Sequence, residues 1–107
     1  MEHQAVLLKE AVNALLTNRN GIYVDATFGR GGHSKKILES LGPQGRLVVL
    51  DKDPQAIEAA LTLATTEPRL TVLYASFSRL QSLLKILDIK KIDGVLFDFG
   101  VSSPQLD

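Results

Sequence analysis

The chain has 107 residues, of which 45% are apolar and 22% are charged, a balance typical of one globular domain rather than of a disordered chain. Twelve basic and twelve acidic side chains give a formal net charge of zero, and there is no cysteine. This composition excludes disulfides, thiolate metal sites and a cysteine nucleophile, and it lacks the positive charge typical of a nucleic-acid binder. The first 16 residues carry neither a basic leader nor a long apolar run, so we expect a cytoplasmic protein without a signal peptide or membrane span.

The first predicted elements are a helix, a strand and a glycine-rich turn. Apolar residues recur at helical spacing between Leu7 and Leu16, which predicts an amphipathic helix. The run Ile22–Thr27 predicts a buried strand, and it leads without a spacer into Gly29–Gly32. Glycines let the backbone approach a ligand closely, and the free amides of the next helix would point at that ligand. The segment therefore predicts the floor of a nucleotide-like cofactor site.

Helices and strands then alternate to the end of the chain. Ser34 is expected to cap one helix, and Asp53 is expected to cap another that has Pro54 at its first position. Ser78 and Gln81 stand at capping-box spacing ahead of a third helix. Apolar runs predict three more strands, at Leu47–Leu50 closing in Asp51, at Leu70–Ala75, and at Ile92–Phe99 ahead of a loop at Gly100–Pro104. The predicted buried helix positions are Ile37, Leu38, Leu41, Ile57, Ala60, Leu61, Ala64, Leu80, Leu83, Leu84 and Leu87.

This alternation predicts an α/β fold on a parallel sheet with right-handed crossovers. If the fourth strand returns to the other side of the first, the strand order is 3-2-1-4, which is the N-terminal half of a doubly wound, Rossmann-like sheet. A ligand then belongs at the switch point, over the carboxyl ends of strands one and four. The unusual residues of the chain follow the strand ends, at Gly29–Gly32, Asp51, Phe77 and Asp98.

The spacing of the glycines and acids narrows the choice of cofactor. From Gly29 the turn reads G-x-G-x-x-S, one glycine short of the dinucleotide fingerprint, and Asp51 lies 20 residues beyond Gly31, where an acid grips ribose hydroxyls. These features fit NAD and S-adenosylmethionine equally, because both ligands contain adenosine. Asp25 favours the second ligand, since a carboxylate beside the turn would disfavour a pyrophosphate and suit an α-amino group.

Four sequence blocks carry a family resemblance: HQAVLLKEAV, GIYVDATFGRGGHSKKIL, GRLVVLDKDPQAI and KIDGVLFDFGVSSPQLD. From His3 to Asp107 the chain resembles the N-terminal part of the bacterial 16S ribosomal RNA cytosine-N4 methyltransferases, the MraW family. The resemblance implies transfer of a methyl group from S-adenosylmethionine to the exocyclic amine of a cytosine in small-subunit ribosomal RNA. Two departures, Ala5 where the family often has proline and Phe99 where leucine is common, touch no proposed contact.

The resemblance also implies which residues bind the cofactor. They are Gly31, Gly32 and His33 at the turn, Asp51 on the ribose, Phe77 near the adenine, and Asp98 and Gln105 beyond the fourth strand. By analogy with other amino-directed methyltransferases, Asp98 and the backbone carbonyls of Ser102–Pro104 are expected to accept hydrogen bonds from the amine that is methylated. The target cytosine must then be single-stranded or flipped out of a helix.

The resemblance further implies that residues 1–107 are part of a larger cofactor-binding domain. The family continues well past Asp107 with the rest of the sheet and an inserted helical domain. We therefore expect most of the RNA-docking surface to lie elsewhere, and little or no turnover from this segment alone. We also expect pairing with a second copy through an exposed edge of the fourth strand.

Other interpretations remain open from the residues themselves. His33 would instead cap or pack beside its helix, Phe77 would be a core residue, and Asp98 would satisfy loop amides. The alternative functions are an NAD-binding oxidoreductase domain, supported by the near-fingerprint, and a non-catalytic interaction module. Titration with NADH and with S-adenosylmethionine distinguishes them.

Overall fold

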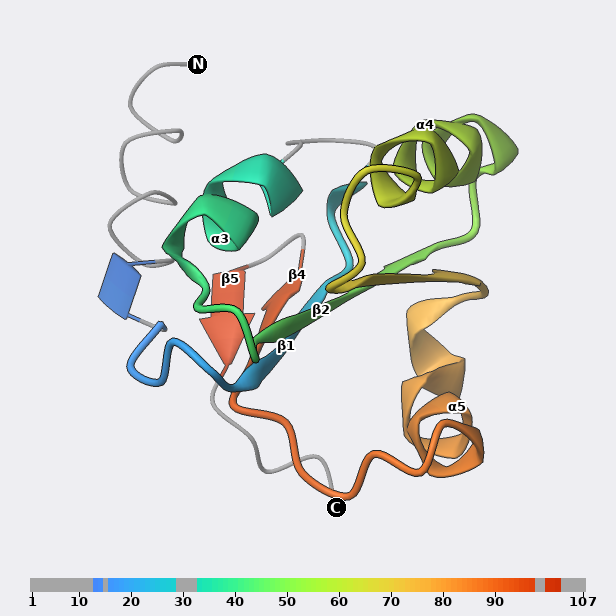
Figure 1. The fold of residues 1–107 in the computed structure, drawn as a ribbon. Helices are drawn as coiled ribbons and strands as arrows, with labels where there is room; N and C mark the ends of the chain where they lie inside the picture. Colours follow the sequence, from blue (N-terminus) through green and yellow to red (C-terminus); the bar gives the residue numbers. More distant parts are fainter. Residues whose placement is uncertain (1–12, 15, 29–32, 98–99, 103–107) are drawn as a thin grey trace.

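The fold is an α/β sandwich in which helices cover both faces of one sheet (Figure 1). The computed structural model describes residues 13–14, 16–28, 33–97 and 100–102. In the described part, the elements in chain order are β1 (Ile22–Asp25), α3 (Ser34–Ser40), β2 (Arg46–Asp51), α4 (Pro54–Ala64), β3 (Leu70–Tyr74), the 3₁₀ turn η1 (Phe77–Arg79), α5 (Leu80–Ile86), β4 (Gly94–Phe97) and β5 (Gly100–Ser102).

The strand order confirms the prediction and adds one strand to it. The sheet runs β3-β2-β1-β4-β5, and the neighbours among β1 to β4 are parallel, with Val24 of β1 in register with both Val48 and Val95. The short strand β5, predicted as a loop, lies antiparallel to β4 and pairs Gly100 with Phe97. The expectation that the fourth strand is an exposed edge is therefore wrong. The edges of the described sheet are β3 and β5, so the premise for pairing two copies through β4 is lost.

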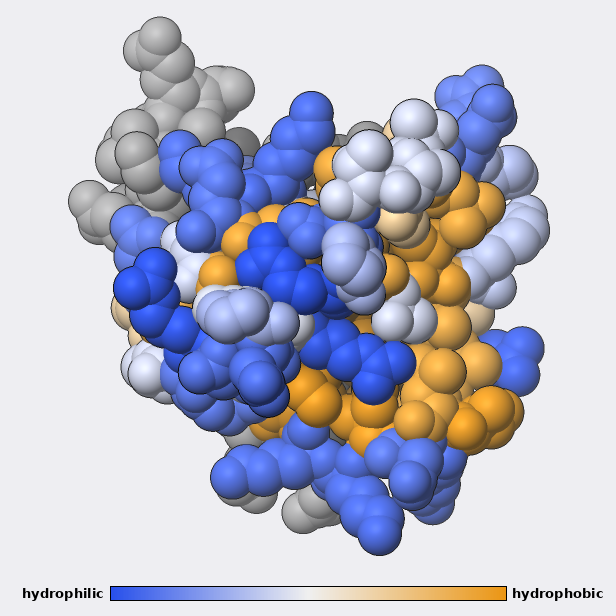
Figure 2. Space-filling view, in the orientation of Figure 1, coloured by the Kyte–Doolittle hydropathy of each residue, from blue (hydrophilic) through white to orange (hydrophobic). Residues whose placement is uncertain are grey.

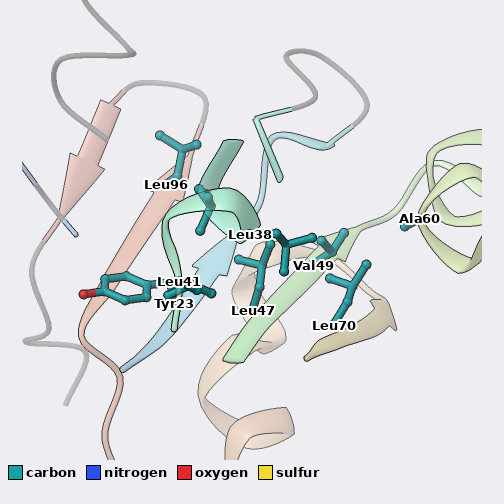
Figure 3. Close-up of a cluster of buried hydrophobic side chains, with 9 residues drawn as sticks. Tyr23, Leu38, Leu41, Leu47, Val49, Ala60, Leu70 and Leu96 are labelled. Atoms are coloured by element: carbon teal, nitrogen blue, oxygen red, sulfur yellow. The ribbon is translucent and has the colours of Figure 1, made fainter. Parts of the chain in front are cut away.

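The two faces of the sheet carry two separate apolar clusters. Along β2, Leu47 and Val49 face one side and Val48 and Leu50 face the other, and none of the four is more than 1% exposed. The first pair packs under α3 and α4 in the cluster of Figure 3, whereas the second packs under α5. Because both faces are covered, a parallel strand reads as a continuous apolar run, which is the pattern that predicted β2.

The described helices follow the predicted stripes with one clear exception, Leu61. The helix predicted between Leu7 and Leu16 lies largely outside the described residues. Ala60 of α4 is fully buried, but Leu61 is 53% exposed, because successive residues are rotated by about 100° around a helix. The buried arc of α4 is centred on Ala60 and also contains Ala56 and Ile57. Figure 2 shows the apolar surface that remains on the flank of the molecule where β3 lies between α4 and α5.

The predicted caps are confirmed at one helix and wrong at two. The Asp53 side chain accepts a hydrogen bond from Gln55 N at 3.0 Å at the start of α4. Ser34, in contrast, is the first residue of α3 and makes no cap. The capping box at Ser78 does not form either, because η1 precedes α5 and the Ser78 hydroxyl hydrogen-bonds to that of Ser76.

The C-terminal end of α5 is closed by a left-handed residue. Asp88 has φ of 59°, and the next residue, Ile89, donates its backbone N–H to Leu84 O at 2.8 Å. Asp88 N donates to Lys85 O at 3.0 Å. These bonds form a Schellman motif, and its usual apolar contact is present because Ile89 and Leu84 share one buried cluster.

Arginines from outside α3 satisfy the carbonyl groups at its C-terminal end. Arg19 Nε donates to Ser40 O at 2.9 Å, and Arg69 Nη1 donates to Leu41 O at 2.9 Å. Arg69 also forms an ion pair with Glu67 at 2.8 Å. Hydrogen bonding by the guanidinium lowers the pKa of the Glu67 carboxyl below its ordinary value of 4.5. The loops at the amino ends of the strands are thus tied to one another.

Candidate cofactor site at the carboxyl edge of the sheet

The carboxyl ends of the four parallel strands lie along one edge of the sheet. Their last residues are Asp25, Asp51, Tyr74 and Phe97. Asp25 is in register with Val49, and Asp51 with Tyr74, so β2 extends two residues beyond the end of β1. The chain leaves β1 toward β2 and β3 and later returns to β4 on the other side. Such a switch point is where open α/β sheets bind ligands.

Asp25 is completely buried at the end of β1. Its Oδ1 accepts hydrogen bonds from Thr27 N at 2.8 Å and from Thr27 Oγ1 at 2.6 Å. Its Oδ2 accepts one from Ser34 Oγ at 2.6 Å. These bonds account for Ser34 making no cap, because its hydroxyl is directed to a carboxylate instead. The suggestion that Asp25 holds a ligand amine does not fit this burial, since the carboxylate has no exposed surface.

Asp51 and Asp53 divide two tasks at the end of β2. Asp51 Oδ1 accepts a hydrogen bond from Asp53 N at 2.9 Å, which turns the chain toward α4. The backbone carbonyl of Asp51 accepts another from Ala75 N at 2.9 Å, just after β3. Asp53 caps α4, as predicted, and Asp51 stays partly exposed at the carboxyl edge. A carboxylate in this place can accept hydrogen bonds from hydroxyl groups of a ligand.

An aromatic pair spans the same edge. The rings of Phe77, which follows β3, and Phe97, the last residue of β4, have centroids 5.8 Å apart and are tilted by 31°. Phe77 is 44% exposed, so the alternative that it is a core residue is wrong. The two rings come from segments that β1 and β2 separate in the sheet. Together they offer an apolar surface on which a flat ring system can stack.

His33 occupies the N-cap position of α3, but its side chain makes no capping hydrogen bond. It is partly exposed and adjoins the glycine-rich turn in sequence. The other proposed contacts, Gly31, Gly32, Asp98 and Gln105, lie outside the described residues. Among the residues that the structure describes, no group of three or more His, Cys, Asp or Glu side chains is placed to hold a metal ion.

The comparisons with known proteins decide the family. The family model described as the MraW methylase family matches residues 1–107. The chain belongs to the MraW methylase family. It is 55% identical over 105 residues to a protein of Neisseria gonorrhoeae named ribosomal RNA small subunit methyltransferase H, which covers 98% of this chain and 33% of that protein. The protein of the same name from Neisseria meningitidis serogroup C is also 55% identical over 105 residues.

The chain spans about a third of the length of these curated relatives. A crystal structure of a candidate rRNA-methylase from Clostridium thermocellum matches it with a TM-score of 0.59 and 20% identity, over 70% of this chain and 43% of that one. At this identity the likeness shows the fold alone. It is consistent with the predicted N-terminal half of a Rossmann-like sheet. None of the described helices is long and apolar enough to cross a membrane.

Three residues at this edge of the sheet, Phe97, Thr27 and Ser34, had no role in the candidate site that the sequence predicted. Phe97 was predicted only as part of a buried strand, and nothing in its local pattern points to Phe77. Thr27 and Ser34 were not expected to meet at Asp25, although the spacing of one acid and two hydroxyls around a glycine-rich turn is a signal that could have been weighed.

Proposed function

We propose that this chain is the N-terminal, cofactor-binding part of an S-adenosylmethionine-dependent methyltransferase that acts on the N4 amine of a cytosine in 16S ribosomal RNA. Membership of the MraW methylase family and the names of the Neisseria relatives support this assignment. The observation that carries it is that β1, β2 and β3 end at one edge of the sheet, where Asp51 closes β2, Phe77 follows β3 and the chain leaves Asp25 of β1 toward α3.

The described residues fit an adenosine-containing cofactor. Asp51 is a partly exposed carboxylate suited to a ribose diol, and Phe77 is an aromatic residue that is 44% exposed, suited to an adenine. His33 and the glycines at positions 31 and 32 would hold the amino-acid portion, and Asp98 and Gln105 would complete the site, on the strength of the matching sequence blocks. The cofactor would supply an electrophilic methyl group on a sulfonium.

The protein's task in such a reaction is alignment rather than covalent chemistry. The lone pair of the cytosine amine is conjugated with the ring and must be freed as the methyl group arrives. We propose that Asp98, which directly follows β4, accepts a hydrogen bond from that amine. The backbone carbonyl of Ser102, expected beside it, does not fit this role, because β5 runs back along β4 and pairs Ser102 with Val95, two residues before the end of β4. The base must leave its helix to reach this position. In the longer protein, Asp98→Asn should lower turnover; unchanged cofactor affinity and unchanged turnover would exclude this role.

The remaining two thirds of the relatives' length would supply most of the RNA-docking surface. The chain itself has no net charge, and charge complementarity to phosphate is the main source of affinity for RNA. We therefore propose that residues 1–107 bind cofactor but give little or no turnover without the remainder. Methylation assays on small ribosomal subunits, with the segment and with the longer protein, test this division.

Calorimetric titration of the longer protein with S-adenosylmethionine and with NADH tests the cofactor assignment. Asp51→Asn should weaken the binding of S-adenosylmethionine at least about tenfold, which corresponds to the loss of a hydrogen bond to a charged group. The amide still accepts the bond from Asp53 N but no longer offers a charged acceptor to the ribose. Asp53→Asn is the matched control, since asparagine caps helices as well as aspartate does, and it should leave affinity unchanged. Binding of NADH alone would favour the oxidoreductase alternative, and binding of neither ligand would favour a non-catalytic module.

A further inference from the structure

Three buried polar side chains join the two ends of the connection between β1 and α3. Asp25, Thr27 and Ser34 are at most 7% exposed. Ser34 Oγ donates to Asp25 Oδ2 at 2.6 Å, across nine positions of sequence, and Thr27 Oγ1 donates to Asp25 Oδ1 at 2.6 Å. They are the only polar or charged residues among the buried ones in the described part of the chain.

Such a cluster needs a reason beyond stability. Burying a carboxylate costs free energy that good hydrogen bonds only offset, and three apolar side chains of similar shape would fill the same space. What the cluster adds is a fixed relative position for the two chain segments that it joins. One carboxylate holds a donor from before the glycine-rich turn and a donor from after it, and residues without a β-carbon cannot hold themselves in place by side-chain packing.

We propose that the Asp25–Thr27–Ser34 cluster is a latch that fixes the base of the glycine-rich turn, and that Asp25 and Ser34 are positioning residues for the amino-acid portion of the cofactor. This inference rests on the proposed function. Asp25 and Ser34 are each 0% exposed, so they act on the ligand only through the backbone that they hold. The adenosine portion is held separately, by the edge that carries Asp51 and Phe77.

Because the latch is proposed to act on the amino-acid portion alone, losing it should change the affinity for ligands that carry this portion and not for ligands that lack it. A general loss of stability would not distinguish the two kinds of ligand. S-adenosylmethionine carries the amino-acid portion, whereas 5′-methylthioadenosine keeps the adenosine and lacks it. Ser34→Ala should lower the affinity for S-adenosylmethionine about five- to tenfold, which is the loss expected when one aligning hydrogen bond is removed. It should change the affinity for 5′-methylthioadenosine less than about twofold. The ratio of the two dissociation constants is therefore the readout.

The experiment measures both dissociation constants by calorimetry in the longer protein, at a temperature where circular dichroism shows each variant folded. Ile37→Val is the control, because it trims a buried side chain of the same helix without touching the latch. Thr27→Val is the second variant if Ser34→Ala does not fold, since it removes one hydroxyl donor and keeps the side-chain shape. Asp25→Asn is the conservative variant, which retains an acceptor for Thr27 and should shift the ratio less than Asp25→Ala.

The possible results separate the two proposals. A ratio that changes in Ser34→Ala or Thr27→Val and stays constant in Ile37→Val supports the latch. The latch is overturned, and the proposed function stands, if the wild type binds S-adenosylmethionine but the variants lower the affinity for both ligands equally or leave both affinities unchanged. If the wild type binds neither ligand, the proposed function fails and the latch fails with it.

Discussion

Replacing Gly21 with alanine should destabilise the protein, because a side chain there meets Asp93. A β-carbon on Gly21 would lie 2.4 Å from Asp93 Oδ2 and 2.6 Å from its Cγ. The same Oδ2 accepts a hydrogen bond from Ile22 N at 2.8 Å, which ties the start of β1 to the segment ahead of β4. Displacing it forfeits a hydrogen bond to a carboxylate, so we expect a loss of about 1.5–3 kcal/mol in the free energy of unfolding.

The cause can be isolated with a double-mutant cycle. Asp93→Ala alone forfeits the same hydrogen bond and should cost a similar amount. Adding Gly21→Ala to it should then change stability by no more than about 0.5 kcal/mol, because Gly21 does not occupy the left-handed region and alanine reduces the entropy of the unfolded chain. Urea unfolding followed by circular dichroism measures all four proteins, with an unchanged slope as the check on two-state behaviour.

The coupling energy between the two substitutions tests whether Asp93 is the cause. The clash and the hydrogen bond involve one carboxylate, so the two substitutions should be coupled by about 1.5 kcal/mol or more. If their effects instead add to within about 0.5 kcal/mol, as those of independent sites do, the carboxylate of Asp93 is not what Gly21 accommodates.

Three further predictions concern the C-terminal end of α5, the aromatic pair and the amino ends of the strands. Asp88→Gly should raise the free energy of unfolding by about 0.5 kcal/mol, because Asp88 has φ of 59° and glycine adopts this conformation without strain; Asp88→Ala, which lacks this freedom, should give no gain in the same urea experiment. Phe97→Leu should weaken binding of 5′-methylthioadenosine about two- to tenfold by removing the ring that packs on Phe77, whereas Phe97→Tyr should bind as the wild type does. The pKa of Glu67 is lowered in the folded state by hydrogen bonds from Arg69, so its contribution to stability is present above the ordinary value of 4.5 and is lost as the pH falls below it. The stability difference between the wild type and Glu67→Gln, about 0.2–1 kcal/mol at neutral pH, should shrink toward pH 3, and a difference that grows on acidification would contradict the ion pair.

Local sequence signals predicted the elements better than their ends. Continuous apolar runs identified β1 to β4, because a strand covered on both faces has no polar side. Asp53 before Pro54 identified the start of α4, because the cap bond joins neighbouring residues. Ser34 has the same local propensity to cap, but a buried carboxylate from β1 captures its hydroxyl instead. The competing partner lies outside any local window, so the sequence favoured the wrong bond.

Other features depend on partners that are distant in the chain. The strand β5 has only three residues, Gly100–Ser102, which is too short for a pattern, and it exists because β4 offers an unpaired edge. Phe77 begins η1, just after β3, and Phe97 is the last residue of β4. Their contact depends on where η1 places the Phe77 ring relative to the sheet. Leu61 was expected to be buried, and only the packing of α4 on its neighbours shows that the buried arc is centred one residue earlier.

The sequence by itself determined the alternation of strands and helices, the parallel sheet and its switch point, because these follow from apolar periodicity, glycine positions and the handedness of crossovers. It also determined the family, through motifs long enough to be specific. The tertiary structure decided which hydrogen bond each buried polar side chain makes, where the sheet ends, and which rings meet at its carboxyl edge. These depend on competition among groups far apart in the chain, and only the folded arrangement brings those groups within bonding distance.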